Sequence, residues 1–308
     1  MSSLAYNKDT AVLFLIFNRP DTTAVVFEAI RKAQPTRLYV SADGPRSEAE
    51  HANCEQARSV IAKVDWECEV FTNFSTHNKG CKVAISDGIT WFFQQEEEGI
   101  VLEDDCLPSV SFFSFCSSML AHYRHDQRIT HIAGCNLQLG EKRGDASYFF
   151  SNLTHVWGWA GWRRVWAQYD VNMSSFPAFK SQEQLNNCLS HLPFKENWLN
   201  ALEKTYNGEI NTWDYQYAYL NMCASGMSVI PNVNLISNIG FGAQATHTMD
   251  QSHNFAALPN EELTTLTHPE FMIASVEADL YAQEKAESTV ASPKKNILSR
   301  TWKRIKSS

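Results

Sequence analysis

The chain of 308 residues has no long apolar segment. Its longest uninterrupted apolar run, Ala11 to Phe17, is seven residues, whereas a membrane-spanning helix needs about 18 or more. The opening residues, MSSLAYNKDT, lack the basic head and apolar stretch of a secretory signal. We therefore expect a cytoplasmic protein. The eight cysteines form no C-x-x-C pair, which argues against a structural zinc site and a disulfide framework.

Basic charge is scarce outside the C-terminal tail. Residues 291–308 contain six Lys and Arg and no acid, so the other residues together carry −14, against −8 for the whole chain. Such an acidic body lacks the basic groove that neutralises nucleic-acid phosphates, and we expect no nucleic-acid partner. A nucleotide could still bind if a cation bridged it to the carboxylates.

The first half of the chain alternates short apolar runs with helical patterns, which is typical of a parallel sheet covered by helices. We expect strands at 12–17, 37–41, 67–72, 99–102 and 128–133, and helices at 21–32, 48–63, 79–95 and 109–124. Asp21 is the expected N-cap of the first helix. The second half is more helical, with helices expected at 183–191, 194–206 and 215–224 and a strand at 227–230. The fold class is therefore α/β.

Three adjacent carboxylates, Glu103, Asp104 and Asp105, directly follow the uncharged strand at 99–102. In open α/β sheets, ligands bind at the carboxyl ends of the strands. Burying adjacent carboxylates is costly unless a cation or hydrogen-bond donors compensate them. A divalent Mg²⁺ or Mn²⁺ ion, with a diphosphate completing its oxygen ligands, would do so. The alternative is a solvated acidic turn before the helix at 109, whose N-terminus also favours carboxylates.

This acidic region carries a family resemblance. The segment EGIVLEDDCLP at 98–108, followed by Phe112-Phe113 and Asp126, resembles the acidic-motif region of GT-A glycosyltransferases, above all the N-acetylglucosaminyltransferase I type. The motifs Asn18-Arg-Pro20 and Ala42-Asp-Gly-Pro45 strengthen it. The resemblance implies a Rossmann-like, mainly parallel mixed sheet flanked by helices, with a helical C-terminal part.

The resemblance runs in motif order from Val12 to about Thr248. It implies one GT-A domain over residues 1–285. Residues up to about 135 would bind the nucleotide, and residues 136–285 would bind the acceptor. Residues 286–308 would form a separate basic tail.

The resemblance also implies roles for individual residues. The residues that would line the uridine diphosphate site are Phe17, Asn18 and Arg19. Asp43 would hydrogen-bond the uracil ring, and Asp105 would ligate the metal ion. The two remaining acidic residues, Glu103 and Asp104, would contact the ribose or the donor sugar. The turn at 42–46 departs from the family pattern, and whether Arg46 replaces a basic contact to phosphate stays open.

The residues alone support part of this assignment. Asn18, Arg19, Asp43 and Arg46 are polar groups at two successive strand ends, where loops on a rigid scaffold often contact ligands. Asn-Arg-Pro-Asp and Asp-Gly-Pro are also good turn formers, so ordinary turn chemistry is the alternative.

Sugar transfer with inversion needs a carboxylate that deprotonates the acceptor hydroxyl. Asp214 is the candidate, because it begins a predicted helix between aromatic residues, where partial removal from water would raise its basicity. It also stands where GT-A enzymes carry the catalytic aspartate. The alternative is a helix cap. His247 follows Gly240 and Gly242, which suit a mobile lid, and the resemblance implies that this histidine meets the metal or the diphosphate.

Four tryptophans occur within ten residues, at 157, 159, 162 and 166. Trp162 and Trp166, four residues apart, are interpreted as one buried helical face. Trp157 and Trp159 are candidates for an acceptor-binding wall, because the apolar faces of sugars pack well on such rings.

In the tail, Ile297, Leu298, Trp302 and Ile305 share one face of a predicted helix, with basic residues largely opposite. A basic amphipathic helix of this kind favours peripheral contact with an anionic membrane. The alternative is a solvated, disordered tail. Membrane contact would place the protein at the inner face of the plasma membrane.

Together with the resemblance, these patterns imply a metal-dependent, inverting glycosyltransferase that uses a UDP-sugar, with N-acetylglucosamine as the donor that the resemblance favours. The acceptor would be a saccharide or lipid-linked saccharide of a cell-surface glycan. One alternative is a sugar-phosphate nucleotidyltransferase. An enzyme of that class would need a glycine-rich phosphate loop after the first strand, where this chain has Phe17 to Pro20. Another is a catalytically inactive sugar-binding protein on the same scaffold.

Overall fold

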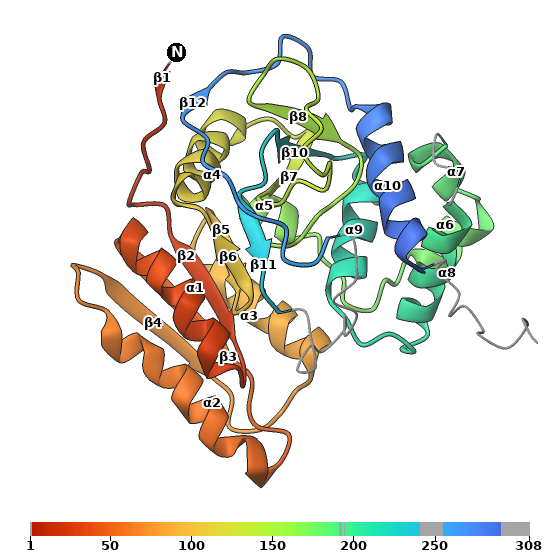
Figure 1. The fold of residues 1–308 in the computed structure, drawn as a ribbon. Helices are drawn as coiled ribbons and strands as arrows, with labels where there is room; N and C mark the ends of the chain where they lie inside the picture. The colour runs from red at the N-terminus through yellow and green to blue at the C-terminus, as the bar shows by residue number, and fades with distance from the viewer. Residues whose placement is uncertain (1, 191–192, 194, 241–254, 291–308) are drawn as a thin grey trace, which may run out of the picture.

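An eight-stranded mixed sheet forms the centre of the protein, in the order β4-β3-β2-β5-β9-β7-β10-β8 (Figure 1). The computed structural model describes residues 2–190, 193, 195–240 and 255–290. The strands of this sheet are β2 Val12–Ile16, β3 Arg37–Ala42, β4 Glu69–Phe74, β5 Glu98–Glu103, β7 Ile129–Ala133, β8 Tyr148–Ser151, β9 Trp159–Trp162 and β10 Met227–Pro231. Two small antiparallel sheets pair β1 Ser2–Ser3 with β12 Thr265–Leu266, and β6 Cys106–Pro108 with β11 Ile236–Asn238.

Strands β4, β3, β2 and β5 pair in parallel, as the alternating pattern predicted. Strand β9 is antiparallel to both β5 and β7, so β7 runs in the same direction as β5. The mainly parallel α/β fold class is thereby confirmed. Every residue of β2, with sequence VLFLI, is buried, because a parallel strand in the middle of a sheet is covered on both faces.

The helices of the first half cover the two faces of the sheet. Helices α1 Pro20–Ala33 and α4 Val110–Tyr123 pack against each other on one face, and α3 Cys81–Gln95 and α5 Arg163–Trp166 pack on the other. Tyr217, on α9 Asp214–Cys223, joins the α5 face, where its ring lies 5.6 Å from that of Trp166. The sheet is therefore the middle layer of three.

Helices of the second half gather beyond strand β8, on the right of Figure 1. They are α6 Phe176–Ser181, α7 Leu185–Cys188, α8 Lys195–Tyr206 and α10 Val276–Val290. Part of the predicted tail, 286–290, belongs to α10, and residues 291–308 lie outside the described residues. Within the described part of the chain, no helix is long and apolar enough to cross a membrane.

Three local predictions were wrong. Helix α1 begins at Pro20 with Arg19 as its N-cap residue, so Asp21 lies in the first turn and does not cap the helix. Proline suits this first position because its missing N–H would have no partner there. The helix expected at 48–63 is divided into η1 Glu48–Glu50, α2 His51–Arg58 and η2 Ser59–Lys63. Trp162 ends strand β9 and is not on a helix, although it is buried as expected.

Candidate active site

The carboxyl ends of β2, β3 and β5 lie at the same edge of the sheet, because these strands are parallel and adjacent. Phe17 to Arg19 follow β2, Asp43 follows β3, and Glu103 ends β5. The structure thus brings together the polar groups that the sequence placed at successive strand ends. This edge is where ligands bind in sheets of this kind.

Arg19 lies between the last two carboxylates of the acidic triplet. Its Nη1 donates to Oδ2 of Asp105 at 2.9 Å, and its Nη2 donates to Oδ1 of Asp104. Oδ2 of Asp104 accepts from the backbone N–H of Phe17 at 3.2 Å. Burial raises the pKa of Asp104, and the charge of Arg19 opposes the rise. Asp104 could contact the ribose or the donor sugar only if Arg19 or the N–H of Phe17 released its carboxylate. That role of Asp104 stays a prediction.

The side-chain carboxyl of Glu103 has no hydrogen-bond partner among the described residues, although its backbone belongs to the ladder of β2 and β5. Burial raises the pKa of its carboxyl strongly, and the charges of Asp105, Asp104 and Asp214 add to the rise. Arg19 opposes it. The start of α3 links Asp214 to this edge of the sheet, because Gly80 donates its backbone N–H to Asp43 at 3.0 Å and Lys82 donates its own to Asn211 at 3.2 Å. We call Asp214 and the triplet the acidic cluster, although Asp214 lies more than a hundred residues further along the chain.

Cys81, the first residue of α3, lies within the same cluster. Burial raises the pKa of its thiol to about 12, and the charges of Glu103, Asp214 and Asp43 contribute to the rise. The thiol therefore stays protonated at neutral pH. Sequence patterns did not single out Cys81, because a lone cysteine at a helix start carries no signal of its own.

Asp43 holds the loop that precedes α3. Its carboxylate accepts from the backbone N–H groups of Gly44, Lys79 and Gly80 and from the side-chain amide of Asn78, at 2.8 to 3.1 Å. The carboxylate therefore fixes the turn after β3 to the turn after β4. Its predicted contact with uracil stays a prediction, and these protein donors already occupy both oxygens.

Asn18 and Arg46 meet at a residue that the sequence patterns missed, Glu50. The side-chain amide of Asn18 donates to Glu50 at 3.1 Å, and the guanidinium of Arg46 forms an ion pair with the same carboxylate. The ion pair with Arg46 lowers the pKa of Glu50. The guanidinium of Arg46 also lies over the ring of Phe17, 5.4 Å from its centroid. Phe17, Asn18 and Arg46, all predicted to border the nucleotide, are thus neighbours.

Asp214 is held by one oxygen. Its Oδ1 accepts from the hydroxyl of Thr212 and from the backbone N–H of Tyr215, the latter at 2.9 Å. Within the described residues, no donor reaches Oδ2. The loop before Asp214 is fixed to the start of α3, because the backbone N–H of Lys82 donates to Oδ1 of Asn211 at 3.2 Å. Asp214 therefore keeps one carboxylate oxygen without a protein donor among the described residues.

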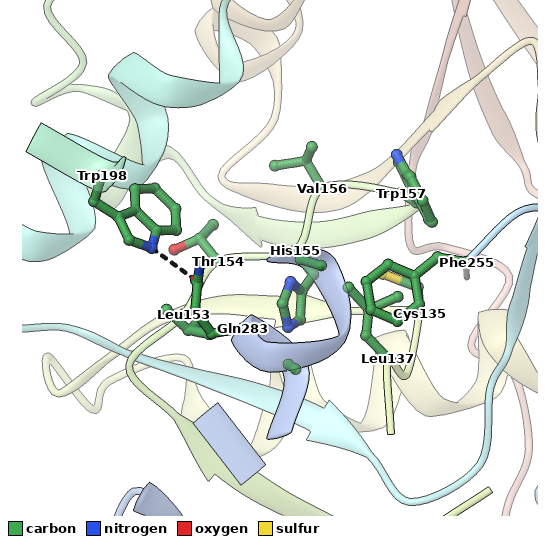
Figure 2. A pocket seen from close by; sticks show the side chains of 12 residues that line it. Cys135, Leu137, Leu153, Thr154, His155, Val156, Trp157, Trp198, Phe255 and Gln283 are labelled. Atoms are coloured by element: carbon green, nitrogen blue, oxygen red, sulfur yellow. Dashed lines mark hydrogen bonds between the residues drawn. The ribbon is translucent and has the colours of Figure 1, made fainter. Parts of the chain in front are cut away.

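The two tryptophans predicted to form an acceptor wall differ in burial. Trp159 is 1% exposed in the core, stacked on Trp213 with ring centroids 6.0 Å apart. This corrects the prediction for Trp159: its position on a central strand buries the ring that was expected to face a sugar. Trp157 precedes β9, is partly buried, and lines a cavity with His155 and Phe255 (Figure 2).

The residues at this edge fit a divalent ion that shares its ligands with a diphosphate. No group of three His, Cys, Asp or Glu side chains suited to a metal exists among the described residues. An ion bound together with a diphosphate needs only one or two carboxylates, because phosphate oxygens and waters supply the rest. Asp105 is the predicted ligand, with its side chain 16% exposed and its carbonyl accepting from the N–H of Ile239 at 2.8 Å. His247 lies outside the described residues.

The backbone at Gly240 lies directly against the side chain of Asp105, the predicted metal ligand. A Cβ atom at this position would lie 2.1 Å from Oδ2 of Asp105, which is far inside van der Waals contact. Only glycine allows this approach. The sequence patterns suggested Gly240 for a mobile lid and did not predict its contact with Asp105.

No family model and no curated protein sequence matches this chain. Its structure is similar to HddC from Yersinia pseudotuberculosis, with 12% identity, 52% of this chain and 80% of that chain covered, and a TM-score of 0.33. It is also similar to 4-diphosphocytidyl-2C-methyl-D-erythritol synthase from Anaerococcus prevotii (7% identity, coverage 54% and 78%, TM-score 0.34). A third structure is apo UDP-glucose pyrophosphorylase (11% identity, coverage 74% and 93%, TM-score 0.37). Similarity at this level carries no argument about activity.

Proposed function

We propose that this protein is a GT-A-type glycosyltransferase that moves a sugar from a UDP-sugar to a saccharide acceptor with inversion. The observation that supports it most is the convergence of Glu103, Asp105 and Asp214 with Arg19 at the carboxyl edge of the sheet. N-acetylglucosamine is the first donor to test, because of the family resemblance. The acceptor would belong to a cell-surface glycan.

On the donor side, Asp105 would hold a Mn²⁺ or Mg²⁺ ion. When bound, such an ion supplies positive charge that stabilises the leaving diphosphate. Arg19 carries a guanidinium whose geometry suits phosphate oxygens as well as carboxylates. Its side chain is 18% exposed, so it is accessible from the site. Phe17, Asn18 and Arg46 would border the nucleotide.

On the acceptor side, Oδ2 of Asp214 would accept the proton of the attacking hydroxyl. The acceptor oxygen would then form a bond to the anomeric carbon as the bond from that carbon to the diphosphate oxygen breaks, and UDP leaves. Thr212 and the N–H of Tyr215 hold Oδ1, which orients the carboxylate without occupying its second oxygen. Fixed orientation of this kind is a large part of catalysis.

Slow hydrolysis of the donor tests this proposal without a known acceptor. UDP-sugars and GDP-sugars are incubated with Mn²⁺ and with EDTA, and the release of free nucleoside diphosphate is measured. We expect Mn²⁺-dependent release of UDP. Asp105→Asn should lower it at least 100-fold, whereas Asp65→Asn, at an exposed carboxylate paired with Arg31 away from this edge, should leave it unchanged. Donor binding without turnover over a broad panel would instead favour an inactive sugar-binding protein.

The second candidate is a nucleotidyltransferase, the class to which the name UDP-glucose pyrophosphorylase refers. The turn after β2 holds Phe17 to Pro20 and no glycine, which disfavours a phosphate loop of the nucleotidyltransferase type. Incubation of a UDP-sugar with pyrophosphate distinguishes the two candidates. A nucleotidyltransferase would produce UTP and sugar 1-phosphate, and a glycosyltransferase would not.

The proposed location is the cytoplasm, at the inner face of the plasma membrane if the basic residues of 291–308 bind anionic lipid. Sedimentation with vesicles of anionic or neutral lipid tests this. The full chain should sediment only with anionic vesicles, and a chain ending at Val290 should stay in solution.

A further inference from the structure

A cavity of about 240 Å³ lies between the turn at Trp157 and helices α8 and α10. Figure 2 shows Trp198 on one side of it, Trp157 and Phe255 on the other, and the ring of His155 between them. Its volume is below the range of about 300–1,000 Å³ that is typical of pockets for complete drug-sized ligands. It therefore suits one part of a larger molecule.

Two contacts connect the lining of the cavity with the elements that carry the candidate active site. Cys135 lines it and follows β7, whose carboxyl end lies at the same edge as that of β5. Gly134, the neighbour of Cys135, accepts from the backbone N–H of Leu235 at 3.0 Å, and β11, which follows Leu235, pairs with β6 directly after Asp105. On the other side, the ring of Trp198 packs edge-on against Tyr215, the neighbour of Asp214, with centroids 6.0 Å apart.

The walls of the cavity are largely apolar. The three polar side chains are those of Thr154, His155 and Gln283. Thr154 accepts from Asn221 at 3.1 Å, and Gln283 accepts from the indole N–H of Trp198 at 2.9 Å. Burial lowers the pKa of His155 to about 4, so its ring is neutral at pH 7. The lining therefore contains no charged side chain and offers few free hydrogen-bonding groups.

This composition decides between two kinds of occupant. A sugar ring would bring several hydroxyl groups into the cavity, and each one left without a partner would cost about 1–3 kcal/mol. An aliphatic chain needs no such partners and gains from leaving water. We propose, on the basis of the proposed function, that the cavity holds the aliphatic aglycone of a lipid-type acceptor, whose sugar lies between Asp105 and Asp214.

Binding of n-alkyl β-D-glucopyranosides from methyl to hexyl, below their micelle concentrations, tests the proposal by isothermal titration calorimetry. The dissociation constant should fall about fourfold for each added methylene, as burial of one CH₂ group predicts, and then level off when the cavity is full. Ala286→Leu narrows the cavity from α10 and should weaken hexyl glucoside binding at least tenfold while leaving the methyl glucoside unchanged. Trp198→Leu, which removes an aromatic wall, should also weaken hexyl binding.

The matched control is Ala121→Leu, the same change at an exposed position of α4, which should leave the whole series unchanged. Equal dissociation constants across the series, or hexyl binding that survives both cavity variants, would overturn the aglycone site. Donor hydrolysis, measured on the same variants, separates the two proposals. If the donor is hydrolysed but glucoside binding does not depend on chain length, only the aglycone site is refuted. If the wild type does not hydrolyse the donor at all, the proposed glycosyltransferase is refuted.

Discussion

Replacing Arg19 by methionine should destabilise the protein strongly. The substitution removes both ion pairs, to Asp104 and Asp105, and leaves Asp104 with its side chain only 4% exposed and without its cation. Removing one partner of a buried pair typically costs about 3–5 kcal/mol, because the remaining charge stays buried and uncompensated. The measurement is the free energy of unfolding in urea at pH 7.5, followed by circular dichroism.

Arg31→Met is the matched control, because Arg31 lies on α1, the helix that follows Arg19, and also binds a carboxylate, Asp65, through two nitrogens. Both side chains of that pair are about half exposed, with values of 42% and 54%, so solvent screens the interaction and little should change. Asp104→Asn in the Arg19→Met background should recover much of the loss. Equal destabilisation by Arg19→Met and Arg31→Met would refute the reasoning that Arg19 compensates a buried carboxylate.

Two further predictions follow from close contacts and burial. Gly240→Ala should reduce Mn²⁺-dependent donor hydrolysis at least tenfold, because the added methyl group would displace Asp105; hydrolysis at the wild-type rate would contradict this. His131 is fully buried, and burial lowers its pKa to about 3. The unfolded chain therefore binds more protons below pH 6.5, and His131 should account for a loss of about 2 kcal/mol in unfolding free energy between pH 7 and pH 5. His131→Gln should reduce that loss in urea titrations at the two pH values, and an unchanged pH dependence would contradict the assignment.

The parallel half of the sheet could be predicted because its strands carry strong local signals. VLFLI in β2 is uncharged and fully buried, and the acidic triplet begins at the last residue of β5. Parallel pairing then places their carboxyl ends at one edge, whatever the details of packing. The position of the candidate site therefore followed from local patterns alone.

The antiparallel part could not be predicted in the same way. Strand β9, with sequence WAGW, is only four residues long and inserts between β5 and β7. Its register depends on long-range pairing, such as Trp162 opposite Glu98, and four residues rich in tryptophan do not distinguish a strand from a helical face. The burial of Trp159 follows from that pairing and was missed for the same reason.

Individual contacts in the site were also beyond the sequence patterns. The donors around Asp43 come from a loop about 35 residues further on, at Asn78 to Gly80. The sequence analysis expected a metal ion to compensate the triplet and did not predict that Arg19 forms ion pairs with Asp104 and Asp105. Side-chain geometry of this kind depends on the packed fold and leaves no periodic signal in the sequence.

The most direct test of the central claim is Mn²⁺ binding by the full chain, measured by electron paramagnetic resonance with and without UDP. If Asp105 and a diphosphate share the ion at this edge of the sheet, bound Mn²⁺ should appear when UDP is present and should be lost in Asp105→Asn. The account would be contradicted if the amount of bound Mn²⁺ did not depend on UDP, or if Asp105→Asn bound as much Mn²⁺ as the wild type.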